Sequence, residues 1–256
     1  MSYAPLGHGF LCPDSESEAS QSPNQASHDR HCLLLWFMSY FAMRFRVLLC
    51  LALFLTTTLR PARAGDGTDG WTIAHQTADV TVFTRPHEGS SIRECKAVSI
   101  IDAEPIVVKR VLDDTADYPQ FMPYVIETRT LSHTADGHVG YQRISPPIVG
   151  DRDYTVRVRC ESKACAGGMS YCNRWEAAND LGPAEIKGVT RVKITRGSWL
   201  LEPCAGGKTR ATYTIYSDSG GGIPTFLLNS ANKTAIPKLF EAVRKQCKAP
   251  KYQAKP

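Results

Sequence analysis

The strongest constraint on the fold is a long series of short segments in which apolar and polar residues alternate. A period of two places successive side chains on opposite faces of a strand, so each segment predicts a strand with one buried face. The turns between them are short and polar, as at residues 134–137 and 205–207, which predicts antiparallel pairing. The segments are residues 125–132, 139–144, 154–160, 169–177, 189–195, 199–202 and 209–216.

An amphipathic helix is predicted after this series. Apolar residues recur there at steps of three and four, at Leu228, Ala231, Ala235, Leu239 and Val243. Pro237 falls inside the helix and is expected to kink it. Because an apolar stripe needs an apolar partner, the simplest arrangement lays this helix across the open face of a strongly curved sheet.

Two strands and two short helices precede the series. Residues 80–84 and 92–101 are rich in β-branched side chains and flank a turn, which predicts a hairpin. Residues 71–75 open the domain as a short helix or an extended segment. Pro105 suits the start of a first helix, and residues 117–123 form a second. The sequence therefore predicts an α+β fold: a curved antiparallel β-sheet wrapped around a long C-terminal α-helix, with two short helices after the first strands.

The first 64 residues differ in composition from the rest. Residues 1–31 are rich in Ser, Gln, Asn and Pro, which predicts disorder. Residues 43–64 resemble a secretory signal: a basic start, an apolar stretch, and Ala62-Arg63-Ala64 at the cleavage position. We expect Met43 to be the true start, residues 1–42 to be a disordered or over-extended N-terminus, and residues 65–256 to be exported, periplasmic or secreted. An uncleaved membrane anchor is the alternative.

Charge and motifs argue against several classes of function. The net charge is +5 and no basic run is present, so we expect no nucleic-acid partner. The nucleophile elbow G-x-S-x-G and the phosphate-binding loop are missing from the sequence, and the glycines at 65, 67 and 70 have the spacing of the dinucleotide fingerprint without the strand before it and the helix after it that this fingerprint needs. The cysteines do not follow the paired spacing of zinc ligands. We therefore expect no catalytic residue, no cofactor and no metal.

Four motifs follow one another in a recognisable order. They are residues 117–123, with Phe121 where a tryptophan is usual; the loop 147–154, ending in Arg152-Asp153-Tyr154; the late strand 197–203; and the glycine-rich entry 221–224 of the last helix, followed by Asn229 and Pro237. In these motifs the chain resembles the START family, the steroidogenic-acute-regulatory-protein-related lipid-transfer domains of the helix-grip superfamily. The resemblance covers about residues 71–247, nearly the whole domain.

The resemblance implies that one lipid, a sterol, phospholipid or fatty-acid-like molecule, lies in a hydrophobic tunnel between sheet and helix. It also implies a lid made of the loop before Arg152 and the C-terminal helix. We expect a monomeric binding protein with a lipid ligand and transient membrane contact, not an enzyme. One rival is a helix-grip enzyme of cyclase or dehydratase type, which would need an acid or base in a polar cavity. The other is a ligand-free interaction module, whose interior would be filled.

The candidate ligand-binding residues are mostly apolar or aromatic: Met122, Tyr141, Trp199, Tyr213, Phe226 and Leu228. Alternation alone does not distinguish a hollow interior from a packed core. Arg143 joins the set because an inward guanidinium would need Glu127 or a lipid head group as its partner.

The candidate lid or membrane-contact residues lie in two loops: Ile148, Val149, Ile223 and Leu227. Apolar loop residues of this kind can dock on a membrane or pack against one another as a closed lid. Arg152 and Asp153 are expected to structure their loop through an ion pair or turn amides, with direct ligand contact as the alternative.

Cys160 and Cys172 stand at nearly mirrored positions around the turn at residues 164–168. If the two strands pair in that register, the sulfurs are close enough to form a disulfide.

Overall fold

The computed structural model describes residues 69–147 and 149–253. Its strands are β1 (Thr72–Gln76), β2 (Val80–His87), β3 (Ser90–Ile101), β4 (Val125–Thr134), β5 (Gly137–Ile144), β6 (Arg152–Cys165), β7 (Gly168–Ala177), β8 (Thr190–Arg191), β9 (Ile194–Cys204) and β10 (Lys208–Asp218). Its α-helices are α2 (Pro105–Asp113), α3 (Tyr118–Phe121), α4 (Thr225–Gln246) and α5 (Pro250–Gln253), and Thr115–Asp117 and Asn179–Leu181 are short 3₁₀ turns. The predicted N-terminal segment 1–42 and signal peptide 43–64 lie outside the described residues.

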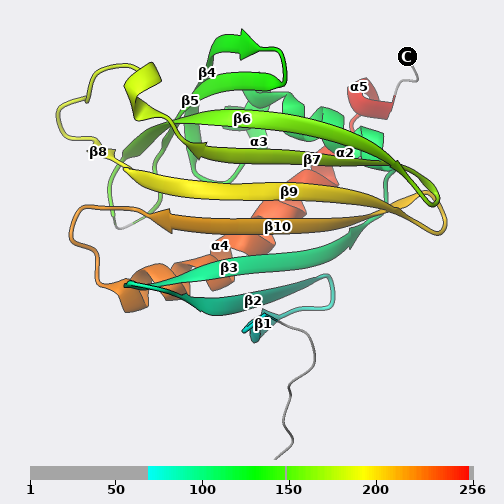
Figure 1. Cartoon of the computed structure of the whole chain (residues 1–256), viewed down its shortest axis with the longest axis horizontal. Coiled ribbons are helices and arrows are strands. Elements are labelled where there is room, and N and C mark those ends of the chain that lie inside the picture. Colours follow the sequence, from blue (N-terminus) through cyan, green and yellow to red (C-terminus); the bar gives the residue numbers. More distant parts are fainter. Residues whose placement is uncertain (1–68, 148, 254–256) are drawn as a thin grey trace, which may run out of the picture. The chain divides into compact units, whose positions relative to one another are not determined.

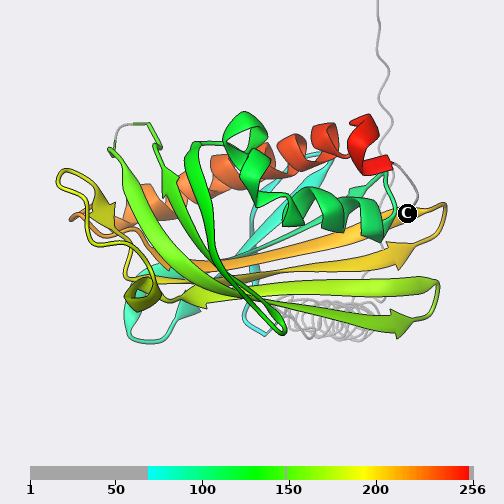
Figure 2. The same ribbon diagram turned by 90° about the horizontal axis from the view of Figure 1, so that it is seen from above.

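The strands form one sheet in the order β1-β2-β3-β10-β9-β7-β6-β5-β4, and every neighbouring pair along this path is antiparallel. Figure 1 shows the strands curving across the view, with α4 behind them. In Figure 2 the helices α2, α3 and α4 all lie on one side of the sheet. The predicted α+β helix-grip architecture is confirmed.

Helix α4 crosses that side of the sheet as a single helix of 22 residues, with Pro237 inside it. Its C-terminal half is well buried: Ile236, Phe240 and Val243 are at most 3% exposed. Its first turn is not, since Phe226 is 69% exposed. The apolar stripe predicted from the sequence therefore packs on the sheet along only part of its length.

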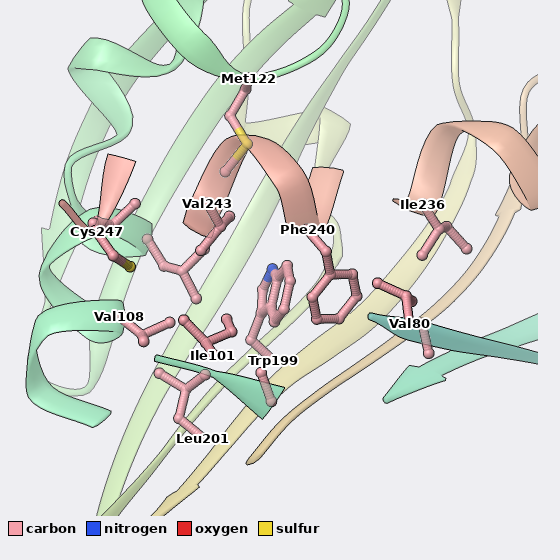
Figure 3. Close-up of a cluster of buried hydrophobic side chains, with 14 of the residues drawn as sticks. Val80, Ile101, Val108, Met122, Trp199, Leu201, Ile236, Phe240, Val243 and Cys247 are labelled. Atoms are coloured by element: carbon pink, nitrogen blue, oxygen red, sulfur yellow. The ribbon is translucent and has the colours of Figure 1, made fainter. Parts of the chain in front are cut away.

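The core lies between the sheet and the C-terminal half of α4. Trp199 of β9 meets Phe240 of α4 with their ring centroids 5.0 Å apart, and Figure 3 shows Ile101, Val108 and Leu201 around the pair. Each fully buried side chain of this size contributes about 1.5–3 kcal/mol relative to an exposed one. This packing anchors one end of α4 against the sheet.

Two local predictions need refinement. The opening segment, predicted as helix or extended, is the strand β1, paired with β2. Residues 189–195, predicted as one strand, are divided between the two-residue strand β8 and the start of β9. The division arises because β8 pairs in parallel with β6, whereas β9 turns away to pair with β10 and β7.

Candidate functional site

A cavity of about 320 Å³ lies between the inner face of the sheet and α4. Helix α4 contributes Asn232, Ala235, Ile236 and Leu239, and the segment from α3 to β4 contributes Met122 and its neighbours. The volume falls at the small end of the range for small-molecule sites, roughly 300–1,000 Å³. The interior of the domain is thus hollow on one side of the packed core.

Strand alternation builds the sheet wall of the cavity. Tyr154, Val156 and Val158 line it at every second position of β6. On the neighbouring strands Trp175, Trp199 and Tyr213 form an aromatic cluster, in which the ring of Tyr213 lies 4.8 Å from that of Trp199 and 5.8 Å from that of Trp175. The wall is therefore mainly apolar and aromatic.

Glycine at position 197 makes room for this cluster. A Cβ atom there would lie 2.4 Å from the ring of Trp175 and 2.2 Å from the carbonyl oxygen of Thr214. Both distances are well below van der Waals contact, so any side chain would displace the indole or the strand.

The polar groups at the cavity are mostly uncharged. Among the described lining residues none is Asp or Glu. Burial raises the pKa of the Tyr154 phenol to about 12 and raises that of Tyr213 further, so both stay protonated. Burial also lowers the pKa of His138, which favours its neutral form. Arg129 is the exception, an exposed cation at the rim that pairs with Glu127 at 3.0 Å.

Asn173 was not recognised from the sequence. Its Nδ2 donates to the Asp113 carboxylate at 3.0 Å, whereas its Oδ1 is buried without a hydrogen-bond partner among the described residues. A free buried acceptor at a cavity wall can receive a hydrogen bond from a ligand hydroxyl. Asn173 shares its strand parity with Trp175, so the alternation of β7 already contained the signal.

The structure brings together four of the seven predicted ligand-binding residues. Met122, Tyr141, Trp199 and Tyr213 border the cavity. Tyr141 differs from the others in the face of the sheet that it occupies. Its register partner is Thr155, and Thr155 lies on the face opposite to that of the cavity-lining Tyr154. Its hydroxyl donates to the Asp153 carboxylate at 3.2 Å, and the side chain is 1% exposed.

The other three predicted ligand-binding residues do not line the cavity. Arg143 pairs with Asp151 through nitrogen–oxygen distances of 2.5 and 3.0 Å, whereas Glu127 or a lipid head group was the partner expected for an inward guanidinium. Phe226 and Leu228 stand in the first turn of α4, which extends past the cavity wall. The apolar stripe of α4 continues beyond the cavity, so the sequence pattern alone could not show where the cavity ends.

Arg152 and Asp153 follow one another on a strand, so their side chains lie on opposite faces and have different surroundings. Asp153 is 1% exposed and accepts from the Arg191 Nε at 2.7 Å, an ion pair that holds β8 against the start of β6. Arg152 is 3% exposed and donates through Nη1 to the carbonyl oxygens of Val149 and Gly150. Both thus contact the loops around the cavity end of β6.

The predicted lid residues are spread over the same end. Ile148 lies outside the described residues. Val149 and Ile223 are half-buried, and Leu227 is 45% exposed beside Phe226.

The predicted disulfide is absent. Cys160 pairs in register with Asn173, and Cys172 pairs with Glu161. The two cysteines therefore stand on opposite faces of the sheet, one residue away from the register that a bridge would need. The six cysteines of the described region are all free thiols.

Within residues 69–147 and 149–253, no three His, Cys, Asp or Glu side chains are grouped as metal ligands. No helix in this part of the chain is both long and apolar enough to cross a membrane.

A curved sheet closed over a cavity by a long C-terminal helix defines a helix-grip domain. The START domain family model matches residues 60–252, and the chain belongs to that family. An uncharacterised protein of Pseudomonas aeruginosa is 26% identical over 163 residues, which cover 63% of this chain and 79% of the relative.

Two further relatives carry descriptive names. Human phosphatidylcholine transfer protein is 23% identical over 190 residues, covering 73% of this chain and 87% of that protein. The crystal structure of a STAR-related lipid transfer protein fragment from Xanthomonas axonopodis is similar with a TM-score of 0.63 and 28% identity, covering 71% of this chain and 100% of the fragment.

Proposed function

We propose that this domain binds one lipid-like molecule in its cavity and carries it, without catalysing a reaction. The observation that carries the proposal is the aromatic and apolar cavity of about 320 Å³ beneath α4. Burial of apolar ligand surface would supply the affinity, at roughly 25 cal/mol per Å² removed from water. The names of the human and Xanthomonas relatives, both lipid transfer proteins, support the same reading.

The chemistry of the wall favours a ligand with few polar groups. The buried Oδ1 of Asn173 offers one acceptor, which suits a hydroxyl such as that of a sterol or a protonated fatty acid. Ligands larger than the cavity, such as a two-chain phospholipid, would require α4 to move away from the sheet. The first turn of α4 and its glycine lead-in, which are less buried than the rest of the helix, are the natural place for that movement.

The two rival functions receive less support. A cyclase or dehydratase needs an acid or base that changes protonation during the reaction. The described lining contains no carboxylate and its buried phenols are held protonated, which leaves a single neutral imidazole, that of His138, without a second titratable partner in the described lining. A ligand-free interaction module would have no reason to keep a cavity at this position.

Transient membrane contact and export are parts of the same proposal. Phe226 and Leu227 are exposed apolar residues at the entry of α4, where insertion into a membrane surface would let a lipid enter beneath the helix. A monomer would suffice for this cycle of uptake and release.

The test is transfer of a fluorescent lipid from donor to acceptor vesicles by the full chain. Ala235 lines the cavity, so Ala235→Phe fills it; Ala231 is exposed one turn earlier, so Ala231→Phe is the matched control. We expect Ala235→Phe to abolish transfer and Ala231→Phe to retain it. Equal transfer by both variants would show that the lipid does not use this cavity.

A further inference from the structure

Arg152 is a buried cation without a carboxylate partner. The residue is 3% exposed, and its Nη1 is satisfied by the Val149 and Gly150 carbonyl oxygens. Its Nε is buried with no hydrogen-bond partner in the described part of the chain.

The nearest carboxylates in sequence are already engaged. Asp151 binds Arg143, and Asp153 binds Arg191. Burial lowers the pKa of Arg152, and no neighbouring anion opposes this effect. Because an uncompensated buried charge is costly, such a guanidinium calls for an anion that the described residues do not provide.

Arg152 faces the lead-in to α4. Its Nη2 lies 3.2 Å from the position that a Cβ atom at Gly221 would occupy, and Gly221 has a φ of +70°. Helix α4 begins four residues later at Thr225. No side chain caps it, and its first turn contains no acidic residue. The free amides and the dipole of a long helix favour a negative charge at that end.

We propose that Arg152 and the N-terminal end of α4 form an oxyanion site that takes a phosphate group, carried by a lipid head group or free in solution. The planar fork of an arginine matches phosphate oxygens, and helix-end amides bind the remaining ones. The exposed side chains of Phe226 and Leu227 stand in the same first turn. A head-group phosphate on Arg152 would therefore place these side chains at the depth of the acyl chains.

The site goes beyond the proposed carrier function, because it lies between Arg152 and the glycine lead-in to α4 and can be filled without a lipid in the cavity. Its test uses a matched pair of substitutions, Gly221→Asn and Gly222→Asn. Both glycines have φ near +70°, which asparagine tolerates better than most residues. Only the side chain at position 221 would meet Arg152, because a Cβ at Gly222 has nothing within 4 Å.

The first arm measures the melting temperature of the full chain against inorganic phosphate at constant ionic strength, balanced with chloride. We expect phosphate to raise the melting temperature of the parent protein and of Gly222→Asn. For Gly221→Asn the half-saturating phosphate concentration should rise about tenfold, as for loss of one hydrogen bond to a charged group. Arg152→Met, checked for folding by circular dichroism, should lose the response.

The second arm identifies the source of the phosphate. Sedimentation with phosphatidylglycerol vesicles is compared with sedimentation with uncharged galactolipid vesicles. If Gly221→Asn binds phosphatidylglycerol vesicles more weakly but galactolipid vesicles as before, the site takes a lipid head group. If Gly221→Asn loses only the response to inorganic phosphate, the site takes soluble phosphate. If Gly221→Asn matches Gly222→Asn in both arms, or if the parent responds to neither probe, the site does not exist. That failure would leave the cavity, tested separately by Ala235→Phe, unaffected.

Discussion

The buried ion pair between Asp153 and Arg191 gives the sharpest stability prediction. The two side chains are 1% and 7% exposed, and they share two nitrogen–oxygen contacts of 2.7 and 3.1 Å. Asp153→Asn removes the negative charge and leaves the guanidinium buried without compensation. Such losses cost about 3–5 kcal/mol, and we expect the lower value because asparagine can still accept one hydrogen bond.

In a domain of this size, about 3 kcal/mol corresponds to a fall in melting temperature of about 6–12 °C. Thermal and urea unfolding monitored by circular dichroism would measure it, with an unchanged urea m-value. Asp151→Asn is the control, because Asp151 and its partner Arg143 are far more exposed, and its effect should be much smaller. The double variant Asp153→Asn/Arg191→Met should be more stable than Asp153→Asn alone, since no charge remains stranded. Equal melting temperatures for Asp153→Asn and Asp151→Asn would refute the reasoning.

Three further predictions concern the pH dependence, the cysteines and the entry of α4. The lowered pKa of His138 means that the unfolded chain binds its proton first, so stability should be complete above about pH 6.5 and decline below it. Unfolding at several pH values should show this decline reduced by His138→Gln, and an unchanged decline would contradict it. Because Cys160 and Cys172 stand on opposite faces of the sheet, a reductant should not alter the midpoint of urea unfolding. A tryptic digest of the oxidised protein in which the two cysteine peptides are linked would prove the register wrong. Phe226→Ser should leave the melting temperature within about 1 °C of the parent, because substitutions at exposed positions have small effects on stability. It should, however, reduce the fraction of protein that sediments with vesicles, and an unchanged fraction would show that Phe226 does not contact the membrane.

Most of the architecture could be predicted because local patterns and tertiary environment agree. The valines of α2 recur at helical spacing and are buried. Trp199, a candidate ligand-binding residue, lies at the cavity and pairs in register with Asn173 of β7. Helix α4 remains continuous through Pro237, so the residue that suggested a kink did not mark a boundary.

What could not be predicted depends on strand register and on the choice of ion-pair partners. Irregularities between β4 and β5, near Val125 and Thr130, shift the pairing by one residue, which alternation cannot reveal. A shift of the same size separates the true partner of Cys160 from the mirrored one. The partner of Arg143 comes from the loop before β6, eight residues along the chain. Such choices depend on how the chain folds back after β5, which local sequence does not encode.

The central claim, that the cavity holds a lipid, is tested most directly by mass spectrometry of an organic extract of the full chain purified without detergent. The parent protein and Ala231→Phe should each release close to one equivalent of a single lipid class, and Ala235→Phe should release none. Lipid released equally by Ala235→Phe, or no lipid from the parent together with no stabilisation by added sterols, fatty acids or phospholipids, would contradict the account.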